Sequence, residues 1–207
     1  MVLTVWDELD GQWRSWADLG CELTDDDWGM PTRLPAWSVR DLYAHVAAWP
    51  VMLARLIGAP PAKEPPDWSD AASLLRAFNQ PGGMATSAAE TVAAAARRAA
   101  SARRPETLAD QFGQVGRQAL KLGRKQPNKI VDYLGSGTVR VVDAADIGLL
   151  EAVVHRLDLN EALDRSDAPS TSALDRVRNV LVGMADSIDF IEAATGRSSA
   201  QVLPVLR

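Results

Sequence analysis

Apolar residues recur along the first segment of the chain at spacings that alternate between four and three. The series is Val2, Trp6, Leu9, Trp13 and Trp16. This spacing places the apolar side chains on one face of a helix, as in the seam of a helical bundle. Gly20 is the predicted end of the helix, because glycine is favoured just after a helix terminus.

A second amphipathic helix is predicted to begin at Ser38, with Asp41 three residues later in the pattern of a capping box. Pro50 is expected to kink this helix, because proline lacks the backbone N–H that a helix interior uses. Gly58 and the prolines that follow end it. Its apolar stripe comprises Leu42, Val46, Trp49, Leu53, Leu56 and Ile57.

The middle of the chain is less regular. Residues 69–100 predict a third helix, which Pro-Gly-Gly at 81–83 interrupts. A short helix is expected near 107–121. Residues 138–142 are rich in β-branched side chains and predict either a brief strand or the entry to the next helix.

A fourth helix is predicted from an Asp143 cap to about Leu163, and a fifth from Ser170 or Thr171 to 195–196. The predicted buried stripe of the fourth helix is Ile147, Leu150, Val154 and Leu157, and the fifth helix carries the apolar residues Leu174, Val177, Val180, Leu181 and Ile188. We therefore expect an all-α, up-down four-helix bundle with additional short helices and long connecting loops, an architecture that often holds metal sites between facing helices.

Composition and length favour a single reduced, intracellular domain. A chain of 207 residues is long enough to bury a core without disulfides, and Cys21 is its only cysteine. The N-terminal segment does not resemble a signal peptide, and no apolar run approaches the roughly 18 residues of a membrane span. We expect a cytoplasmic protein with no membrane partner.

The net charge of −5 hides an uneven distribution. Residues 7–27 are strongly acidic, whereas residues 97–129 are strongly basic. Nucleic-acid binding is one interpretation of the basic stretch, but interleaved aromatic residues are missing there, so a solvated helix face is favoured. An anionic small-molecule partner is an intermediate interpretation.

The chain has only two histidines, and both lie in amphipathic helical segments. His45 is at the edge of the apolar stripe of the second helix, and Glu151 and His155 are four residues apart on one face of the fourth. Two histidines and a glutamate form a three-ligand set with an open position, as in catalytic metal sites. The alternatives are a core histidine bonded to a backbone carbonyl and a surface Glu151–His155 pair.

Two motifs strengthen the metal interpretation. The first is Trp28-x-x-Pro-Thr-Arg-Leu-Pro-x-Trp-Ser-Val-Arg-Asp-Leu-x-x-His45, and the second is Glu151-x-x-x-His155-x-x-Asp158-Leu159. Together they resemble the mycothiol-dependent maleylpyruvate isomerase family of DinB-like metal-binding bundles. The resemblance implies a DinB-like bundle core over residues 1–165 with His45, Glu151 and His155 as metal ligands.

The resemblance also implies a divalent metal, most often zinc but alternatively nickel or another ion, and mycothiol as cosubstrate. Cys21 lies among acidic residues, whose negative charge disfavours a thiolate, so it is a poor nucleophile. An external low-molecular-weight thiol acting on a small electrophile fits better. We therefore expect a metal- and thiol-dependent S-transferase or isomerase. A non-catalytic metal-binding or stress-related bundle is the alternative.

Residues 166–207 are expected to form a C-terminal helix and tail packed on the same domain. They are too few for the sterol-carrier-like domain that supplies a catalytic arginine in the isomerase resembled here. S-transfer is therefore favoured over maleylpyruvate isomerisation. Arg33 and Arg156 are the catalytic candidates for binding an anionic substrate, with Arg40 also near the site in sequence; a surface charge is the alternative for each.

Trp49, one turn after His45, and Asp158, one turn after His155, are candidates for cofactor binding. Asp158 would orient a metal ligand, or would be a surface or packing carboxylate. All seven tryptophans fall within residues 1–68. They predict either a pocket wall, a packed core or the interface of a homodimer.

Overall fold

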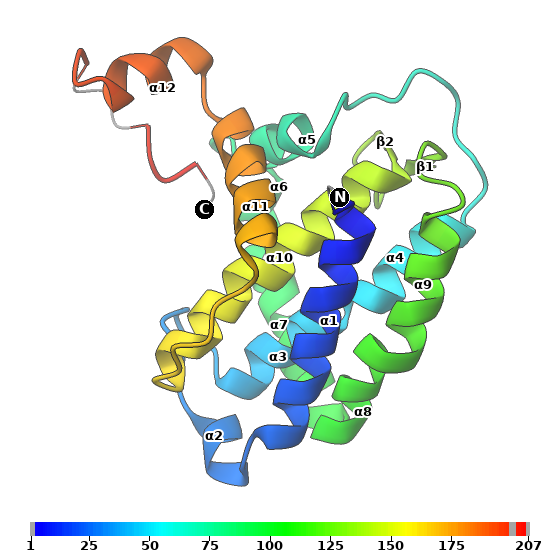
Figure 1. The fold of residues 1–207 in the computed structure, drawn as a ribbon, viewed down its shortest axis with the longest axis vertical. Helices are drawn as coiled ribbons and strands as arrows, with labels where there is room; N and C mark the ends of the chain where they lie inside the picture. Colours follow the sequence, from blue (N-terminus) through cyan, green and yellow to red (C-terminus); the bar gives the residue numbers. More distant parts are fainter. Residues whose placement is uncertain (1–2, 199–201, 206–207) are drawn as a thin grey trace.

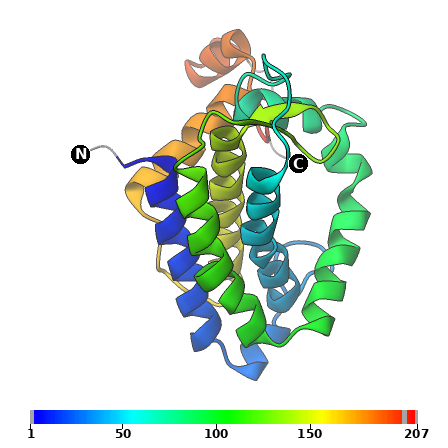
Figure 2. The same ribbon diagram turned by 90° about the vertical axis from the view of Figure 1, so that its right-hand side faces the viewer.

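Four helical segments lie side by side along the long axis of the molecule (Figures 1 and 2). The computed structural model describes residues 3–198 and 202–205. The segments are α1 (Val5–Glu22), α3 with α4 (Val39–Ala47 and Trp49–Gly58), α8 with a π-helix and α9 (Pro105–Asp110, Gln111–Gly116 and Arg117–Gly123), and α10 (Val141–Ala162). α1 and α10 run in one direction and the other two segments in the opposite one. The prediction of an all-α bundle is confirmed.

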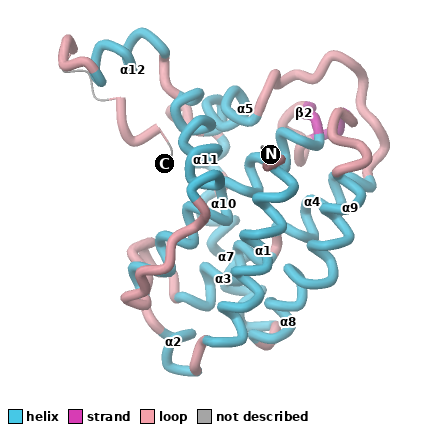
Figure 3. The backbone as a smooth tube through the Cα atoms, viewed as in Figure 1, coloured by secondary structure: helices cyan, strands magenta, loops and turns pink. Residues whose placement is uncertain are grey.

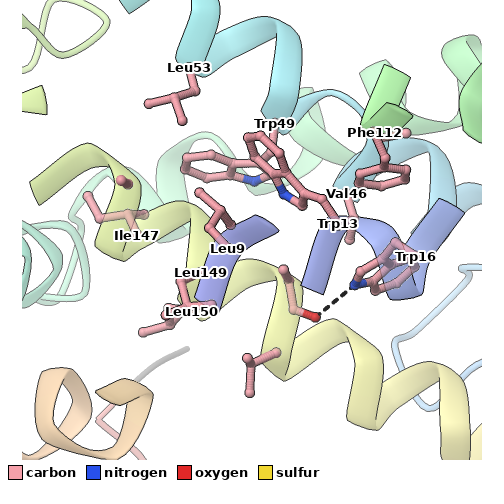
Figure 4. Close-up of a cluster of buried hydrophobic side chains, with 14 of the residues drawn as sticks. Leu9, Trp13, Trp16, Val46, Trp49, Leu53, Phe112, Ile147, Leu149 and Leu150 are labelled. Atoms are coloured by element: carbon pink, nitrogen blue, oxygen red, sulfur yellow. Dashed lines mark hydrogen bonds between the residues drawn. The ribbon is translucent and has the colours of Figure 1, made fainter. Parts of the chain in front are cut away.

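The core of the bundle is rich in tryptophan. Trp13 and Trp16 of α1 are 1% and 0% exposed, as the four-and-three spacing predicts. Figure 4 shows the two rings near Val46 of α3, Trp49 of α4 and Phe112 of the π-helix. Nε1 of Trp16 donates to the backbone oxygen of Ala152, 3.0 Å away, so the ring also ties α1 to α10. Val2, the first residue of the predicted stripe, lies outside the described residues.

The second predicted helix is divided into α3 and α4. Ser38 caps α3: its Oγ accepts from the backbone N of Asp41 at 3.2 Å, and Oδ2 of Asp41 accepts from the backbone N of Ser38 at 3.0 Å. The helix is interrupted at Ala48, which ends α3 and begins α4. Pro50 lies in the first turn of α4, where a backbone N–H has no partner within the helix, so the missing N–H of proline costs nothing. The expected kink is therefore a helix boundary, which leaves His45 in the last turn of α3.

The additional elements lie at the ends and flank of the bundle. They are α2 (Asp25–Gly29), α5 (Ala71–Phe78), α6 (Met84–Ser87), α7 (Ala89–Ala102), α11 (Thr171–Met184), α12 (Ser187–Ala194) and strands β1 (Ile130–Asp132) and β2 (Thr138–Arg140). Figure 3 shows the long loop between α4 and α5. None of the helices in the described ranges combines the length and apolar composition needed to cross a membrane.

Residues 138–140 form a strand, paired antiparallel with β1 so that Val139 lies opposite Val131. This pairing fixes the start of α10 at Val141, two residues before the predicted cap. Asp143 is not the N-cap but the third helical residue, where its Oδ2 accepts from the backbone N of Arg140 at 3.3 Å.

Three other expectations about helix ends and faces are wrong. α1 continues past Gly20 to Glu22. Leu157 is 41% exposed, because α10 turns that face away from the bundle. The fifth helix does begin after a Ser170 cap, but it ends at Met184, and α12 is separate. Ile188 on α12 is 69% exposed, since α12 lies away from the bundle (Figure 1).

Candidate metal centre

The two histidines and Glu151 meet between α3 and α10. His45 comes from the last turn of α3, whereas Glu151 and His155 project from the same face of α10, one turn apart. The two helices pack directly against each other. The interhelical contact therefore brings together residues about a hundred positions apart in sequence.

The carboxylate of Glu151 lies between the two imidazoles. Its Oε2 is 2.9 Å from Nε2 of His45 and 3.3 Å from Nε2 of His155. The ring centroids of the two histidines are 5.1 Å apart and nearly perpendicular. One nitrogen or oxygen atom from each of the three residues lies within 4.8 Å of the other two. Among the described residues, these are the His, Cys, Asp or Glu side chains that cluster closely enough, in a group of at least three, to hold a metal ion.

The triad is partly accessible. The side chains of His45, Glu151 and His155 are 19%, 21% and 16% exposed. The site is thus shielded enough to strengthen charge interactions and still open to a small molecule. Such partial access suits a site that keeps one position free.

Charge and burial act against each other in this site. Burial opposes the charge of Glu151, but hydrogen bonds with His155 and His45 outweigh it and hold the pKa of Glu151 well below its usual range. Burial also opposes the charge of His155, but hydrogen bonds with Asp158 and Glu151 raise its pKa to about 9. Glu151 is therefore a carboxylate anion held between two imidazole rings, and the ring of His155 holds its proton more tightly than a free histidine does.

Asp158 contacts His155 on the other edge of the ring, where Oδ2 lies 2.7 Å from Nδ1. Nε of Arg33 donates to Oδ1 of the same carboxylate at 2.6 Å. Burial would raise the pKa of Asp158, but its bonds to His155 and the nearby Arg33 lower it. Nδ1 of His155 is therefore engaged with Asp158. Nε2, which faces Glu151, is the ring nitrogen that could coordinate a metal ion.

Two further side chains near the triad were not among the predicted site residues. The ring of Trp37 packs edge-on against His45, with centroids 5.5 Å apart. Tyr133 is buried, and burial together with the charge of Glu151 raises the pKa of its hydroxyl. Trp37 directly precedes the Ser38 cap and belongs to the first motif, which was a usable signal. Nothing in sequence links Tyr133 to Glu151.

The structure places Arg156, predicted as a catalytic residue, in contacts with α1 and with the segment after α10, outside the triad. Arg156 is 5% exposed. Its Nε donates to Oδ1 of Asn160 at 3.0 Å, its Nη1 to the backbone oxygen of Ser15 at 3.2 Å, and its Nη2 to Asp167. One residue along a helix is a rotation of about 100°, so Arg156 faces α1 while His155 faces α3.

Trp49 and Arg40, two further candidates for ligand binding, make packing and interhelical contacts in the structure. Trp49 is 7% exposed and packs in the hydrophobic core (Figure 4). Its ring leaves little room beside Gly148. Its side chain is part of the packed interior, so a cofactor-binding role has no support from this position. Arg40 donates from Nη2 to the backbone oxygen of Arg103 at 2.9 Å, which ties α3 to the end of α7.

The fold and this site define an α-helical bundle that holds a His/Glu/His cluster between facing helices, a class in which metal and cofactor sites are built from inward-facing side chains. The family model described as the mycothiol maleylpyruvate isomerase N-terminal domain matches residues 9–160. The chain belongs to this family, and its helical bundle agrees with the DinB-like architecture. None of the curated proteins and none of the solved structures matches the chain.

Proposed function

We propose that this protein is a divalent-metal-dependent enzyme that uses mycothiol, or a related low-molecular-weight thiol, in S-transfer to or isomerisation of a small electrophile. The family match supports the link to mycothiol. The observation that carries the proposal is the position of Oε2 of Glu151, within 3.3 Å of Nε2 of both histidines. This arrangement brings together three atoms that can coordinate a metal, two imidazole nitrogens and one negatively charged carboxylate oxygen.

His45, Glu151 and His155 would hold the metal. Two imidazole nitrogens and one carboxylate oxygen suit zinc best, and nickel is the next ion to test. A bound divalent ion would supply the positive charge that stabilises a thiolate at neutral pH. Asp158 fixes the ring orientation of His155 through Nδ1, and Trp37 covers one side of His45.

The thiol is proposed to come from outside the protein. Cys21 is exposed near the end of α1, whereas the triad lies between α3 and α10. Arg33 is the proposed binder of an anionic group on the electrophile or the thiol. Its side chain is 52% exposed and reaches Asp158, so it lies beside the triad with part of its guanidinium open to solvent.

The test begins with metal content. Untagged wild-type protein and the His155→Ala variant are analysed by mass spectrometry after incubation with zinc or nickel. Near one equivalent in the wild type and almost none in the variant is expected. Conjugation of mycothiol to 1-chloro-2,4-dinitrobenzene and isomerisation of maleylpyruvate are then followed with and without a chelator.

Loss of turnover on chelation, and its return with added metal, would support the enzyme. If the metal binds but no thiol or electrophile in the panel reacts, the protein is better described as a non-catalytic metal-binding bundle. If neither protein retains metal, the proposal is wrong at its first step.

A further inference from the structure

A second concave site lies away from the triad, between α1 and the segment that joins α10 to α11. The cleft has a volume of about 360 Å³, within the range of small-molecule pockets. Mostly polar side chains line it, among them Asp7, Glu8, Arg156, Asp167 and Ser170. None of the triad residues lines it.

Glu8 is the residue in this cleft whose bonding is incomplete. It is 5% exposed. Its Oε2 accepts from Oγ of Ser170 at 2.8 Å, but its Oε1 is buried without a hydrogen-bond partner. A buried carboxylate oxygen without a donor is costly, so the carboxylate of Glu8 has unused capacity to accept a hydrogen bond from a ligand in the cleft that Glu8 lines.

The other charges in the cleft are already engaged. Asp7 accepts from Thr4 and pairs with Arg124 at 2.7 Å. Asp167 pairs with Arg156 and with Arg165. Glu8 therefore leaves an uncompensated negative charge, which favours a cation with N–H donors over an anion.

We infer that this cleft binds a small organic cation, a primary amine or a guanidinium, whose nitrogen donates to the carboxylate of Glu8. Leu3 and Pro169 offer apolar contact for the carbon chain of such a ligand. A divalent metal is a poorer match, because it needs several oxygen or nitrogen ligands and only one oxygen is free. Among the residues that the structure describes, the side chains close enough together to hold a metal ion are those of the triad, which lies outside this cleft.

The geometry offers two variants that act in different ways. Glu8→Gln removes the charge while keeping an oxygen to accept from Ser170. Gly11 lines the cleft on the exposed side of α1, and a Cβ added there meets no atom within 4 Å. Gly11→Leu therefore narrows the cleft, and replacing glycine in a helix raises helical propensity. Asp10→Asn removes the same charge from α1 outside the cleft and serves as the control.

Binding of agmatine and n-butylamine is measured by isothermal titration and saturation-transfer NMR, with neutral n-butanol as the uncharged probe. Saturable binding of the amines to the wild type is expected, with butanol at least about tenfold weaker, because a charge-assisted hydrogen bond is lost. Glu8→Gln and Gly11→Leu should each weaken amine binding by about tenfold or more. Asp10→Asn should stay within about twofold, since exposed charges contribute little.

His155→Ala should bind the amines as the wild type does, which separates this cleft from the triad. Circular dichroism checks the fold of each variant, and Gly11→Leu keeps the test valid if Glu8→Gln does not fold. Absence of saturable amine binding to the wild type, or equal affinities for Glu8→Gln and Asp10→Asn, would overturn the inference.

Discussion

Asp158 and His155 form the contact that organises the candidate metal centre. Oδ2 of Asp158 lies 2.7 Å from Nδ1 of His155, closer than the 3.3 Å between Glu151 Oε2 and Nε2 on the other edge of the ring. The imidazole is thus fixed between two carboxylates on its own helix. One of them is buried behind the ring, and the other faces His45 of α3.

Removing this support should weaken metal binding without removing a ligand. Asp158→Ala is expected to lower zinc affinity by about 10- to 100-fold, because a free ring loses its orientation and basicity. Asp158→Asn keeps an acceptor and should lose less. Competition with a chromophoric chelator gives the affinities, and Glu161→Gln, an exposed charge on α10, is the control. An Asp158→Ala affinity equal to that of the control would show that Asp158 does not position His155.

Arg33 should matter less for the metal than Asp158 does. Its side chain is 52% exposed, so its ion pair with Asp158 contributes at most about 1 kcal/mol to the orientation of that carboxylate. Arg33→Ala is expected to change zinc affinity only about threefold but to raise the KM of an anionic substrate. A double-mutant cycle with Asp158→Ala measures the coupling. Strictly additive effects in that cycle would contradict the proposed link.

Metal affinity should rise with pH. The pKa of His155 is raised to about 9, since its bonds to Asp158 and Glu151 outweigh burial. The metal-free site therefore holds a proton on His155 below pH 9, and a metal must displace it. Between pH 7 and 8.5 the affinity should increase by about tenfold per pH unit, with release of about one proton. Calorimetry in buffers of different ionisation enthalpy counts that proton.

The Asp158→Ala variant provides the control for this pH dependence. Because Asp158 is the main group that raises the pKa of His155, its loss should move the end of the rise to lower pH. A wild-type affinity that does not change between pH 7 and 8.5 would mean that His155 is already neutral there.

Arg156 should support stability and not metal binding. Its guanidinium is buried and donates to Asn160, Ser15 and Asp167, so Arg156→Ala removes three hydrogen bonds, although Asp167 keeps its pair with Arg165. We expect the free energy of unfolding to fall by about 2–3 kcal/mol with unchanged metal content. Urea denaturation measures the loss, and Arg178→Ala, an exposed arginine of α11, is the control. Loss of metal in a folded Arg156→Ala protein would return Arg156 to the site.

The local pattern of the sequence was sufficient to locate most helical segments, though not all of their ends, and two parts of the candidate site. The four-and-three spacing in α1 and the capping box at Ser38 are short-range effects, because side chains three or four apart share a helix face whatever surrounds them. The same rule placed Glu151 and His155 together on α10. Joining them to His45 rested on the two motifs.

Tertiary structure decided the features that depend on which helix packs against which. The pairing of β2 with β1 moved the start of α10 to Val141, and packing of α10 between α1 and α3 separated Arg156 from His155. Periodicity assigns each residue an angle around its helix but does not say which neighbour lies at that angle. Contacts such as Arg33 with Asp158, or Glu151 with His45, join residues more than a hundred positions apart, so only the packed bundle determines them.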